Sequence, residues 1–433
     1  MRRSTCVLLF ACAAAASALR AVRAADWPQW RGPHRDGVTT EPSGLSGGRW
    51  APVELWEKND WGEGTTSPIL AAGRVYVMGW RGGKDTVCCL RASDGAVAWK
   101  RSYPAKRYSR KLKTPAGNKK HFGGPFSTPA FDASSGLLFT LSCDGDLRSW
   151  NAKTGAPGWD LNLYDRYTIP LDREHFGHTS SPLVMDGNVI VEVGARGRGN
   201  LVGFDARTGR ERWRSGADNV KGRSGGPVAF AVSGTQCVAS FSNDALLVMR
   251  AKDGRVIGRH PWKVKYGHTI PSPAPYGGAL VVTSWNPPVT RVFEHDAGRG
   301  FVLAWETRAV SSKVCSPVAS EGYAYVVSAG KLACLDLKTR QRKWQSPRTF
   351  GGNDEGTCLV AGDGNVVVFG GNTLALVAPG KTSSSYKELG RVSKVLARTK
   401  RCYPHVALAE GYVLCKDGNG SMACLRVGRA GSP

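Results

Sequence analysis

Short apolar runs separated by Gly-rich turns recur along the chain at a period of about 45 residues. Each unit opens on a Ser, Thr or Gly step that usually ends in Pro, and it continues through two apolar strands and a third strand that leads into a polar turn. Runs of this length between Gly turns predict β-strands. The openings lie at residues 66–68, 127–129, 180–182, 225–227, 271–273 and 315–317, with weaker copies at 356–358 and 403–405.

The turn that closes each unit carries the clearest signature. In its fullest form it reads Asp-x-x-Thr-Gly-x-x-x-Trp, as in the run from Asp205 to Trp213. The Gly supplies a positive φ without steric cost, and we expect the Trp on the outermost strand to cover the seam between neighbouring sheets. The seam residues predicted in this way are Trp56, Trp99, Trp159, Trp213 and Trp344. Arg340 replaces the Gly in one unit and Gly258 replaces the Trp in another, while the fifth and seventh units keep little of the motif.

Four short strands in each of eight units predict an all-β fold, an eight-bladed β-propeller of four-stranded blades. The eighth unit ends near residue 427 without an outer strand, whereas residues 54–57 form an orphan strand that carries Trp56. We therefore expect the N-terminal strand to complete the last blade, which removes exposed strand edges. The expected organisation is a signal peptide at 1–24, an N-terminal arm at 25–53, the propeller at 54–427 and a C-terminal tail at 428–433.

The first residues are typical of a secretory signal peptide. Two arginines follow Met1, an apolar run covers residues 7–19, and a small-x-small site ends at Ala24. A lipoprotein signal with Cys12 as the anchored residue is an alternative, but Phe10 stands where such signals prefer a small residue. No later stretch approaches the ~20 apolar residues that span a bilayer. We therefore expect an exported protein without a transmembrane segment, periplasmic or associated with the cell envelope.

The chain is strongly basic, with 59 Lys and Arg against 34 Asp and Glu and a formal net charge of +25. Such a surface attracts polyanions. Because export argues against intracellular nucleic acid, the partners we expect are an envelope protein or an anionic polymer. One segment between two units concentrates the charge and is a predicted contact site: Lys106, Arg107, Arg110, Lys111, Lys113, Lys119 and Lys120. The alternative is that basic side chains only solvate a large β-surface.

The Asp-x-x-Thr-Gly-x-x-x-Trp units, the eight predicted blades and the export signal together resemble the pyrroloquinoline-quinone (PQQ)-like β-propeller repeat family. Its members include quinoprotein alcohol dehydrogenases and BamB, a lipoprotein of the outer-membrane β-barrel assembly machine. The stretch Asp26-Trp-Pro-Gln-Trp-Arg-Gly-Pro-His-Arg-Asp-Gly37 is similar to the start of a group of BamB-like exported propellers. Two Trp on this Pro-stiffened stretch favour an arm docked on the ring over a free binding tag. The resemblance covers residues 26–427 and implies a fold more than a function.

The resemblance leaves two functions to weigh. Quinoprotein dehydrogenases hold PQQ above the central tunnel with calcium, an Asp base and a disulfide between adjacent cysteines, which draws attention to the pair Cys88-Cys89. No acidic and amide constellation for calcium can be placed, and the repeat aligns Cys89 with Cys334 and Cys424, which favours buried packing. We therefore expect no catalytic residue, metal or cofactor, and a monomeric BamB-like binding or scaffold protein. A PQQ- and calcium-dependent alcohol or sugar dehydrogenase is the alternative.

A further candidate site lies where the unit openings converge. In the repeat register, His178 and His268 occupy equivalent positions before the innermost strand, and Arg223, Lys313 and Phe122 fall near corresponding points. We expect these residues around one mouth of the tunnel, on the face from which the insertions 100–126 and 160–179 emerge. A concave mouth of this composition suits an anionic ligand or a peptide. The alternative is that these side chains only hydrogen-bond neighbouring loops.

Overall fold

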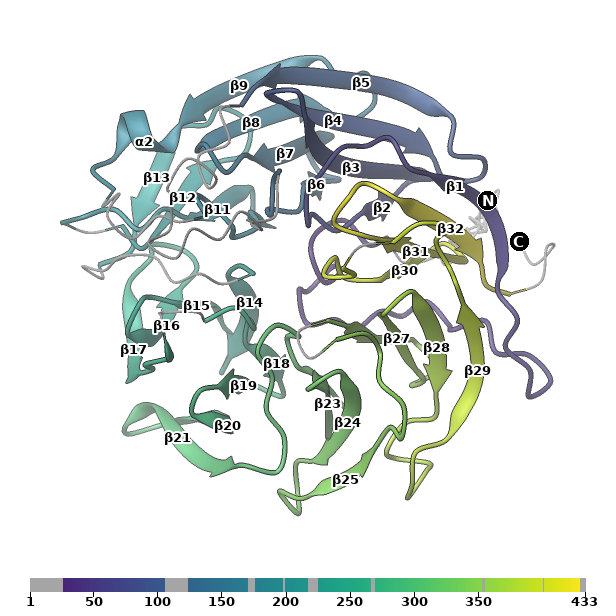
Figure 1. Cartoon of the computed structure of the whole chain (residues 1–433). Coiled ribbons are helices and arrows are strands. Elements are labelled where there is room, and N and C mark those ends of the chain that lie inside the picture. Colours follow the sequence, from purple (N-terminus) through teal and green to yellow (C-terminus); the bar gives the residue numbers. More distant parts are fainter. Residues whose placement is uncertain are drawn as a thin grey trace, which may run out of the picture.

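The computed structural model describes residues 26–105, 124–169, 176–197, 199–216, 225–265, 269–352, 355–399 and 401–428. Within these ranges the chain forms eight antiparallel four-stranded sheets around a central axis, each sheet one blade of a propeller (Figure 1). In seven blades the strands follow in chain order, with the first strand innermost. The eight-bladed propeller predicted from the sequence is confirmed.

The strands are short because each crosses only the height of one blade. Blade 1 consists of β2 (Ile69–Ala71), β3 (Arg74–Arg81), β4 (Lys84–Arg91) and β5 (Val97–Pro104), and blade 2 consists of β6 (Ala130–Asp132), β7 (Leu137–Leu141), β8 (Asp146–Asn151) and β9 (Pro157–Asn162). Blade 3 consists of β10 (Leu183–Met185), β11 (Asn188–Glu192), β12 (Leu201–Asp205) and β13 (Glu211–Arg214). Blade 4 consists of β14 (Val228–Val232), β15 (Thr235–Phe241), β16 (Ala245–Arg250) and β17 (Val256–Pro261). A short helix, α2 (Leu163–Arg166), follows β9 and is capped by the side chain of Asn162.

Blades 5 to 7 continue the same order. Blade 5 consists of β18 (Ala274–Tyr276), β19 (Ala279–Trp285), β20 (Pro288–Asp296) and β21 (Gly300–Thr307). Blade 6 consists of β22 (Val318–Ser320), β23 (Tyr323–Ser328), β24 (Lys331–Asp336) and β25 (Arg342–Gln345). Blade 7 consists of β26 (Thr357–Val360), β27 (Val366–Gly370), β28 (Thr373–Val377) and β29 (Glu388–Ser393). Blade 8 is built from β30 (Ala407–Ala409), β31 (Tyr412–Lys416), β32 (Met422–Arg426) and the first strand of the chain, β1 (Val53–Lys58).

The strand β1 closes the ring. It pairs antiparallel with β32 and places Trp56 opposite Cys424, so both ends of the propeller sequence share one sheet. Figure 1 shows β1, in purple, beside the yellow β32. The closure predicted from the sequence is therefore confirmed, and it supplies the outer strand that the eighth unit lacks.

Tryptophans on the outermost strands fasten neighbouring blades together. The indole Nε1 of Trp99 in blade 1 donates to the carbonyl of Ala152 in blade 2 at 2.9 Å, and its ring lies against Gly155 of that blade. The same hydrogen bond joins Trp56 to Ala92 at 2.8 Å and Trp159 to Ala206 at 2.9 Å. These three seams therefore combine a large ring with a satisfied indole donor, whereas the Nε1 atoms of the seam residues Trp213 and Trp344 are buried without a partner.

A cysteine on the third strand faces several of these tryptophans. The paired positions are Cys89 with Trp99, Cys334 with Trp344, and Cys424 with Trp56, and all three cysteines are buried. In β4 and β24 the pairing register shifts directly after the cysteine. A small, weakly polar side chain fits beneath a large ring that must lean over the neighbouring blade.

The blade openings are linked to one another by hydroxyl groups. The backbone N–H of Ser67 donates to Thr128 Oγ1 at 2.9 Å, and the N–H of Thr128 donates to Ser181 Oγ at 3.0 Å, so blades 1, 2 and 3 are joined in sequence. Elsewhere Ser272 N–H donates to Ser316 Oγ at 3.0 Å, and His405 N–H donates to Ser67 Oγ at 2.8 Å. The Ser and Thr residues of the openings thus satisfy backbone groups that no strand partner reaches.

In two blades that depart from the sequence motif, the position of the seam tryptophan is occupied differently. In blade 5, Trp305 lies opposite Val292 with a register shift beside it, which is the position of the seam tryptophan. In blade 7 the corresponding residue is Gly390, and a Cβ there would lie 2.9 Å from the Cβ of Trp50, so the arm supplies a tryptophan against that blade. The fifth unit therefore keeps more of the motif than the sequence suggested.

Candidate functional site

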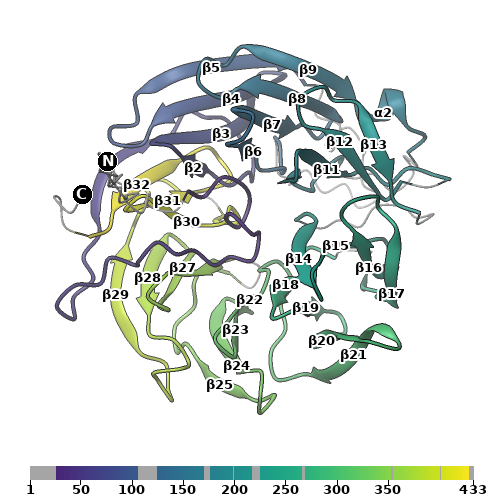
Figure 2. The ribbon, with the colours of Figure 1, turned by 180° about the vertical axis from the view of Figure 1, so that it is seen from behind.

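Residues 26–41 of the arm lie across the centre of the ring. Figure 2 shows the purple arm passing in front of the blades between the axis and the outer edge near β29, where Trp50 lies against Gly390. Trp27 forms an antiparallel bridge with Leu70 of blade 1, and the N–H of Thr39 donates to Val360 of blade 7 at 3.0 Å. Further hydrogen bonds reach blades 2, 3 and 8: Phe131 N–H to Pro28 O, Val184 N–H to Gln29 Oε1, and Gly411 N–H to Glu41 Oε1.

Two arginines of the arm are fully buried at the centre of the ring. Arg31 donates to the carbonyls of Pro273, at 3.3 Å, and Pro317, which open blades 5 and 6. Arg35 donates to the carbonyl of Pro182, which opens blade 3. The guanidinium groups thus hydrogen-bond the arm to the openings of three blades. They can do so because each planar guanidinium presents several donors at once.

An aromatic ring lies between these charges and the last blade. Trp30 makes an edge contact with His405, with ring centroids 5.1 Å apart, and both arginines stack on its ring at 5.6 Å and 5.3 Å. A Cβ on Gly225 would lie 2.4 Å from this indole, so the opening of blade 4 needs glycine there. Burial lowers the pKa of Arg31 to about 10 and that of Arg35 to about 9, and it lowers the pKa of His405 to about 3.

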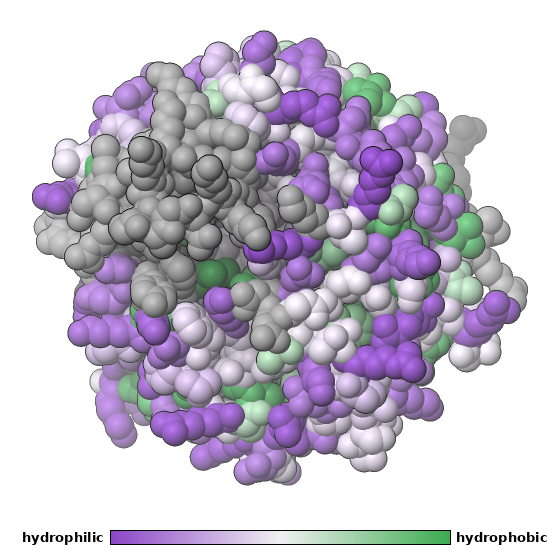
Figure 3. Space-filling model, viewed as in Figure 1, coloured by the Kyte–Doolittle hydropathy of each residue, from purple (hydrophilic) through white to green (hydrophobic). Residues whose placement is uncertain are grey.

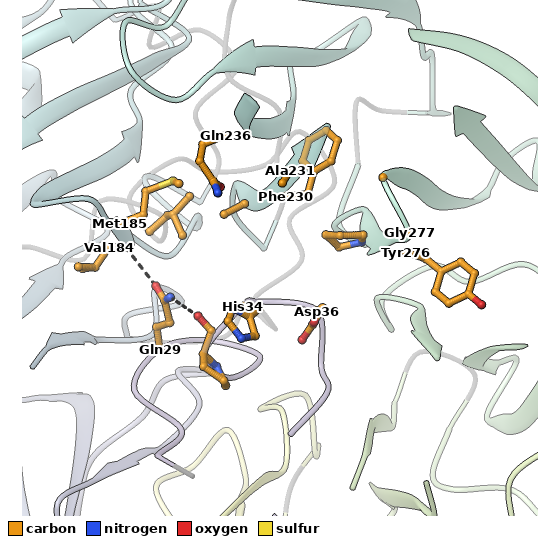
Figure 4. Close-up of a pocket in the computed structure, with 15 residues that line it drawn as sticks. Gln29, His34, Asp36, Val184, Met185, Phe230, Ala231, Gln236, Tyr276 and Gly277 are labelled. Carbon is orange, nitrogen blue, oxygen red and sulfur yellow. Dashed lines mark hydrogen bonds between the residues drawn. The ribbon is translucent and has the colours of Figure 1, made fainter. Parts of the chain in front are cut away.

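A cavity of about 440 Å³ lies between the arm and the innermost strands β10, β14 and β18. Figure 4 shows His34 of the arm and Gln236 of blade 4 on opposite sides of it, with Met185 and Tyr276 on its walls. Among the described residues that line it, none is Lys or Arg, and Asp36 is the single carboxylate. Its size falls in the range of small-molecule sites, and its lining suits a neutral or apolar group with a polar end rather than an anion.

The predicted ligand-facing residues fall partly within the described chain. His178 is buried, donates its backbone N–H to Cys143 O at 3.1 Å and packs its ring against Tyr164 in a tilted arrangement with centroids 5.0 Å apart. Lys313 places its Nζ 5.3 Å from the ring centroid of Trp285. His178 lies before the opening of blade 3 and contacts Cys143 of blade 2. Lys313 lies before the opening of blade 6 and contacts Trp285 of blade 5. Arg223, His268 and Phe122 lie outside the described residues, so the predicted mouth as a whole stays a prediction.

The predicted basic contact segment also lies outside the described residues. Lys106, Arg107, Arg110, Lys111, Lys113, Lys119 and Lys120 all fall between the end of β5 and the start of blade 2. In Figure 3 the coloured part of the face shown is covered mostly by hydrophilic side chains. The described surface is therefore compatible with a polar partner, and the contact segment remains an expectation.

The adjacent cysteines lie away from the centre of the ring. Cys88 and Cys89 occupy consecutive positions on β4, the third strand of blade 1, opposite Lys100 and Trp99 of β5. Consecutive side chains of a strand point to opposite faces, and both thiols are free and buried. Burial raises the pKa of Cys88 to about 12 and also raises the pKa of Cys89. Neither thiol is placed to stack on a ligand at the axis.

The fit of PQQ with calcium can be tested on the residues themselves. Within the ranges that the structure describes, no three His, Cys, Asp or Glu side chains gather closely enough to hold a metal ion. Calcium needs six to eight oxygen ligands, usually with several carboxylates. The described residues thus hold no acidic cluster of the kind that calcium prefers, and the arm places its own aromatic and charged groups at the centre of the ring.

Sequence reasoning did not find the two central arginines. Both arginines follow Trp30 closely and flank Gly32-Pro33-His34, but this stretch carries no sign of their burial, and charged residues are rarely buried without a partner. It also missed Trp305, because the turn glycine Gly300 precedes it by five positions instead of four.

Comparisons with known proteins agree with this fold. A family model described as outer membrane protein assembly factor BamB matches residues 109–346 and 257–432. BamB from Moraxella catarrhalis superimposes with a TM-score of 0.61 at 13% identity, over 87% of this chain and 100% of that protein. Quinohemoprotein alcohol dehydrogenase from Comamonas testosteroni superimposes with a TM-score of 0.62 at 13% identity, over 94% of this chain and 81% of that one.

One enzyme is also similar in sequence over a limited stretch. Quinohemoprotein alcohol dehydrogenase ADH-IIG of Pseudomonas putida is 26% identical over 155 residues, which is 34% of this chain and 19% of the enzyme. The matched stretch thus spans about a fifth of that relative.

No helix among the described residues is both long and apolar enough to cross a membrane.

Proposed function

Because the chain belongs to the PQQ-like β-propeller repeat family described by the BamB model, whose repeats build a fold without fixing a reaction, we propose that it is a non-catalytic binding protein of the cell envelope. The single observation that carries this proposal is the position of the arm. Trp30, Arg31 and Arg35 fill the centre of the ring and are buried against the blade openings. Because these side chains are packed inside the ring, partners are left with the outer faces of the propeller and the space beside the arm.

Two surfaces support a binding role. The cavity between the arm and blades 3 to 5 combines apolar walls with amide, imidazole and carboxylate groups, which suits a side chain or short segment of a protein partner. The basic segment at residues 106–120 suits an anionic polymer or an acidic protein surface, because clustered Lys and Arg attract polyanions at a rate that falls with salt.

A PQQ-dependent alcohol or sugar dehydrogenase is the second candidate, and the local sequence similarity to a quinohemoprotein alcohol dehydrogenase favours it. The full chain is incubated with PQQ and calcium, and dye reduction is followed with a panel of alcohols and sugars. We expect the same rate with and without PQQ. Sustained PQQ-dependent turnover, on the order of 1 s⁻¹ or faster, would contradict the binding proposal and establish the enzyme.

The anionic contact is tested with a charge reversal. Retention of the full chain on immobilised alginate is compared with retention on neutral dextran over a salt gradient. The double variant Lys111→Glu, Lys113→Glu is set against a matched control, Lys153→Glu, Lys338→Glu, at exposed turns of blades 2 and 6. We expect the first pair to elute at much lower salt than the control. Equal elution of the two variants means that the charge acts only as a general solvating surface.

A further inference from the structure

The central arginines carry more hydrogen-bond donors than the described chain satisfies. A guanidinium presents five N–H donors. Arg35 uses one on Pro182 O and one on Ser181 O at 3.1 Å, and its Nε is buried without a partner. Arg31 uses three, on Pro273 O, Pro317 O and Asp36 O, and its Nε is likewise buried without a partner. All of the acceptors are neutral backbone carbonyls.

The charge of Arg35 has no counter-charge among the described residues. Neither central arginine takes part in a described ion pair, and the charged group that acts on Arg35 is Arg31, which repels it. The carboxylate of Asp36 acts on Arg31 instead. His405, the ring beside Trp30, has a pKa lowered to about 3 and is neutral near pH 7. Among the residues that the structure describes, the centre of the ring therefore holds at least one positive charge without a counter-charge.

Such an arrangement is costly unless something completes it. The penalty for burying an unpaired ion is several kcal/mol even after relaxation, and buried unsatisfied donors in native proteins point to a water or an ion. A guanidinium binds an anion best through two neighbouring N–H groups. Arg35 offers its Nε–H together with unused hydrogens on its terminal nitrogens, which is such a pair.

We propose that the centre of the ring is a structural anion site, in which Arg35, assisted by Arg31, binds one small inorganic anion of chloride or phosphate size. The backbone lies close to both groups: a Cβ on Gly226 would lie 2.4 Å from the Nη2 of Arg35, and one on Gly225 would lie 2.4 Å from Trp30. These close approaches favour a small ion over an extended ligand. The anion locks the arm to the blade openings, and this role is independent of any partner on the outer faces.

The anion is counted directly on the full chain. The protein is dialysed into sodium methanesulfonate, whose anion coordinates weakly, and is then unfolded, and the released chloride and phosphate are measured by ion chromatography. We expect about one equivalent of one of the two anions for each chain. An amount far below one equivalent, or an equal amount retained by the variant Arg35→Gln, overturns the proposal and leaves an adventitious ion only.

Linkage provides the second measurement. An anion that binds the folded state alone raises the melting temperature as its concentration increases. At constant ionic strength, with methanesulfonate replaced stepwise by chloride or by phosphate, we expect a saturable rise for the natural chain and for the exposed control Arg210→Gln. We expect no such rise for Arg35→Gln. A rise of the same size in all three chains contradicts the site, and the ion count on the natural chain decides the matter if Arg35→Gln does not fold.

Discussion

Trp99 of blade 1 and Ala152 of blade 2 are joined by a hydrogen bond of 2.9 Å from the indole Nε1 to the carbonyl oxygen, across the seam between the two sheets. The ring of Trp99 simultaneously covers Gly155, whose φ is +69°. The glycine is thus required twice, for its backbone conformation and for the absence of a side chain.

The substitution Gly155→Ala tests this double requirement. A Cβ there would lie 2.6 Å from the indole of Trp99, so we expect a loss of about 2–4 kcal/mol in the free energy of unfolding, from the positive φ and the forced ring movement together. Gly136→Ala is the matched control, since its φ is +70° and a Cβ there meets no atom within 4 Å, and it should lose only about 1 kcal/mol. Urea unfolding measures both. Equal losses in the two variants would show that the ring of Trp99 moves away from the added Cβ without a cost in stability.

Arg340 stands where other units have this glycine, and it keeps the same backbone conformation with a φ of +62°. Its guanidinium stacks on the seam tryptophan Trp305, 5.6 Å from the ring centroid. A residue other than glycine at this position either strains the turn or changes its type. The backbone N–H of Arg340 donates to Asp336 O, as the turn glycines of two other units do to their Asp or Asn, so the turn keeps its type. The strain lies in Arg340 itself, which adopts the left-handed conformation.

Replacing Arg340 separates strain from stacking. Arg340→Ala removes the stacking but keeps the left-handed backbone, so we expect a loss of about 0.5–1 kcal/mol in the free energy of unfolding. Arg340→Gly also relieves the strain by about 1 kcal/mol, and it should be nearly as stable as the natural chain. The difference in melting temperature between the two variants is the measurement. An alanine variant at least as stable as the glycine variant would refute the strain.

The repeat made the fold predictable, whereas for the arm only its docking on the ring could be predicted, and not its path. The opening steps and the turn glycines recur in register, so each copy supports the others and the eight blades follow from local rules. The arm occurs once, and its path depends on contacts with blades 1, 2, 3, 7 and 8 that lie far away in sequence. Nothing in the pattern around Trp30 distinguishes an arginine that will be buried from one that will be solvated.

Asp85 gives the molecule a predictable response to pH. It is buried on β4 opposite Tyr103, and its pKa is raised to about 8, first by burial and then by Asp144 and Asp146. The folded state therefore binds a proton that the unfolded state releases above about pH 4. This contribution to stability is fully present below pH 4 and is lost as the pH rises toward 8.

The variant Asp85→Asn keeps the shape of the side chain and removes its titration. We expect it to match the natural chain near pH 4 and to be more stable by on the order of 1–3 kcal/mol near pH 9, where the natural chain must bury a carboxylate. Asp94→Asn, at an exposed turn where Arg91 lowers the pKa of the carboxyl, should bring no such gain. Urea unfolding across the pH range measures the difference. A constant offset at all pH values would show that Asp85 is charged in the folded state.

The indole of Trp30 lies at the centre of the ring and contacts several blades at once. Trp30 is 6% exposed and lies against Gly225 of blade 4 and His405 of blade 8, with both buried arginines stacked on it. Trp30→Ala should therefore reduce the free energy of unfolding by about 3–5 kcal/mol. His34→Ala, four residues later and exposed at the cavity, should change it by less than about 0.5 kcal/mol. If the arm only lay over the ring, the two variants would unfold at the same urea concentration; a large difference shows that the arm is part of the core.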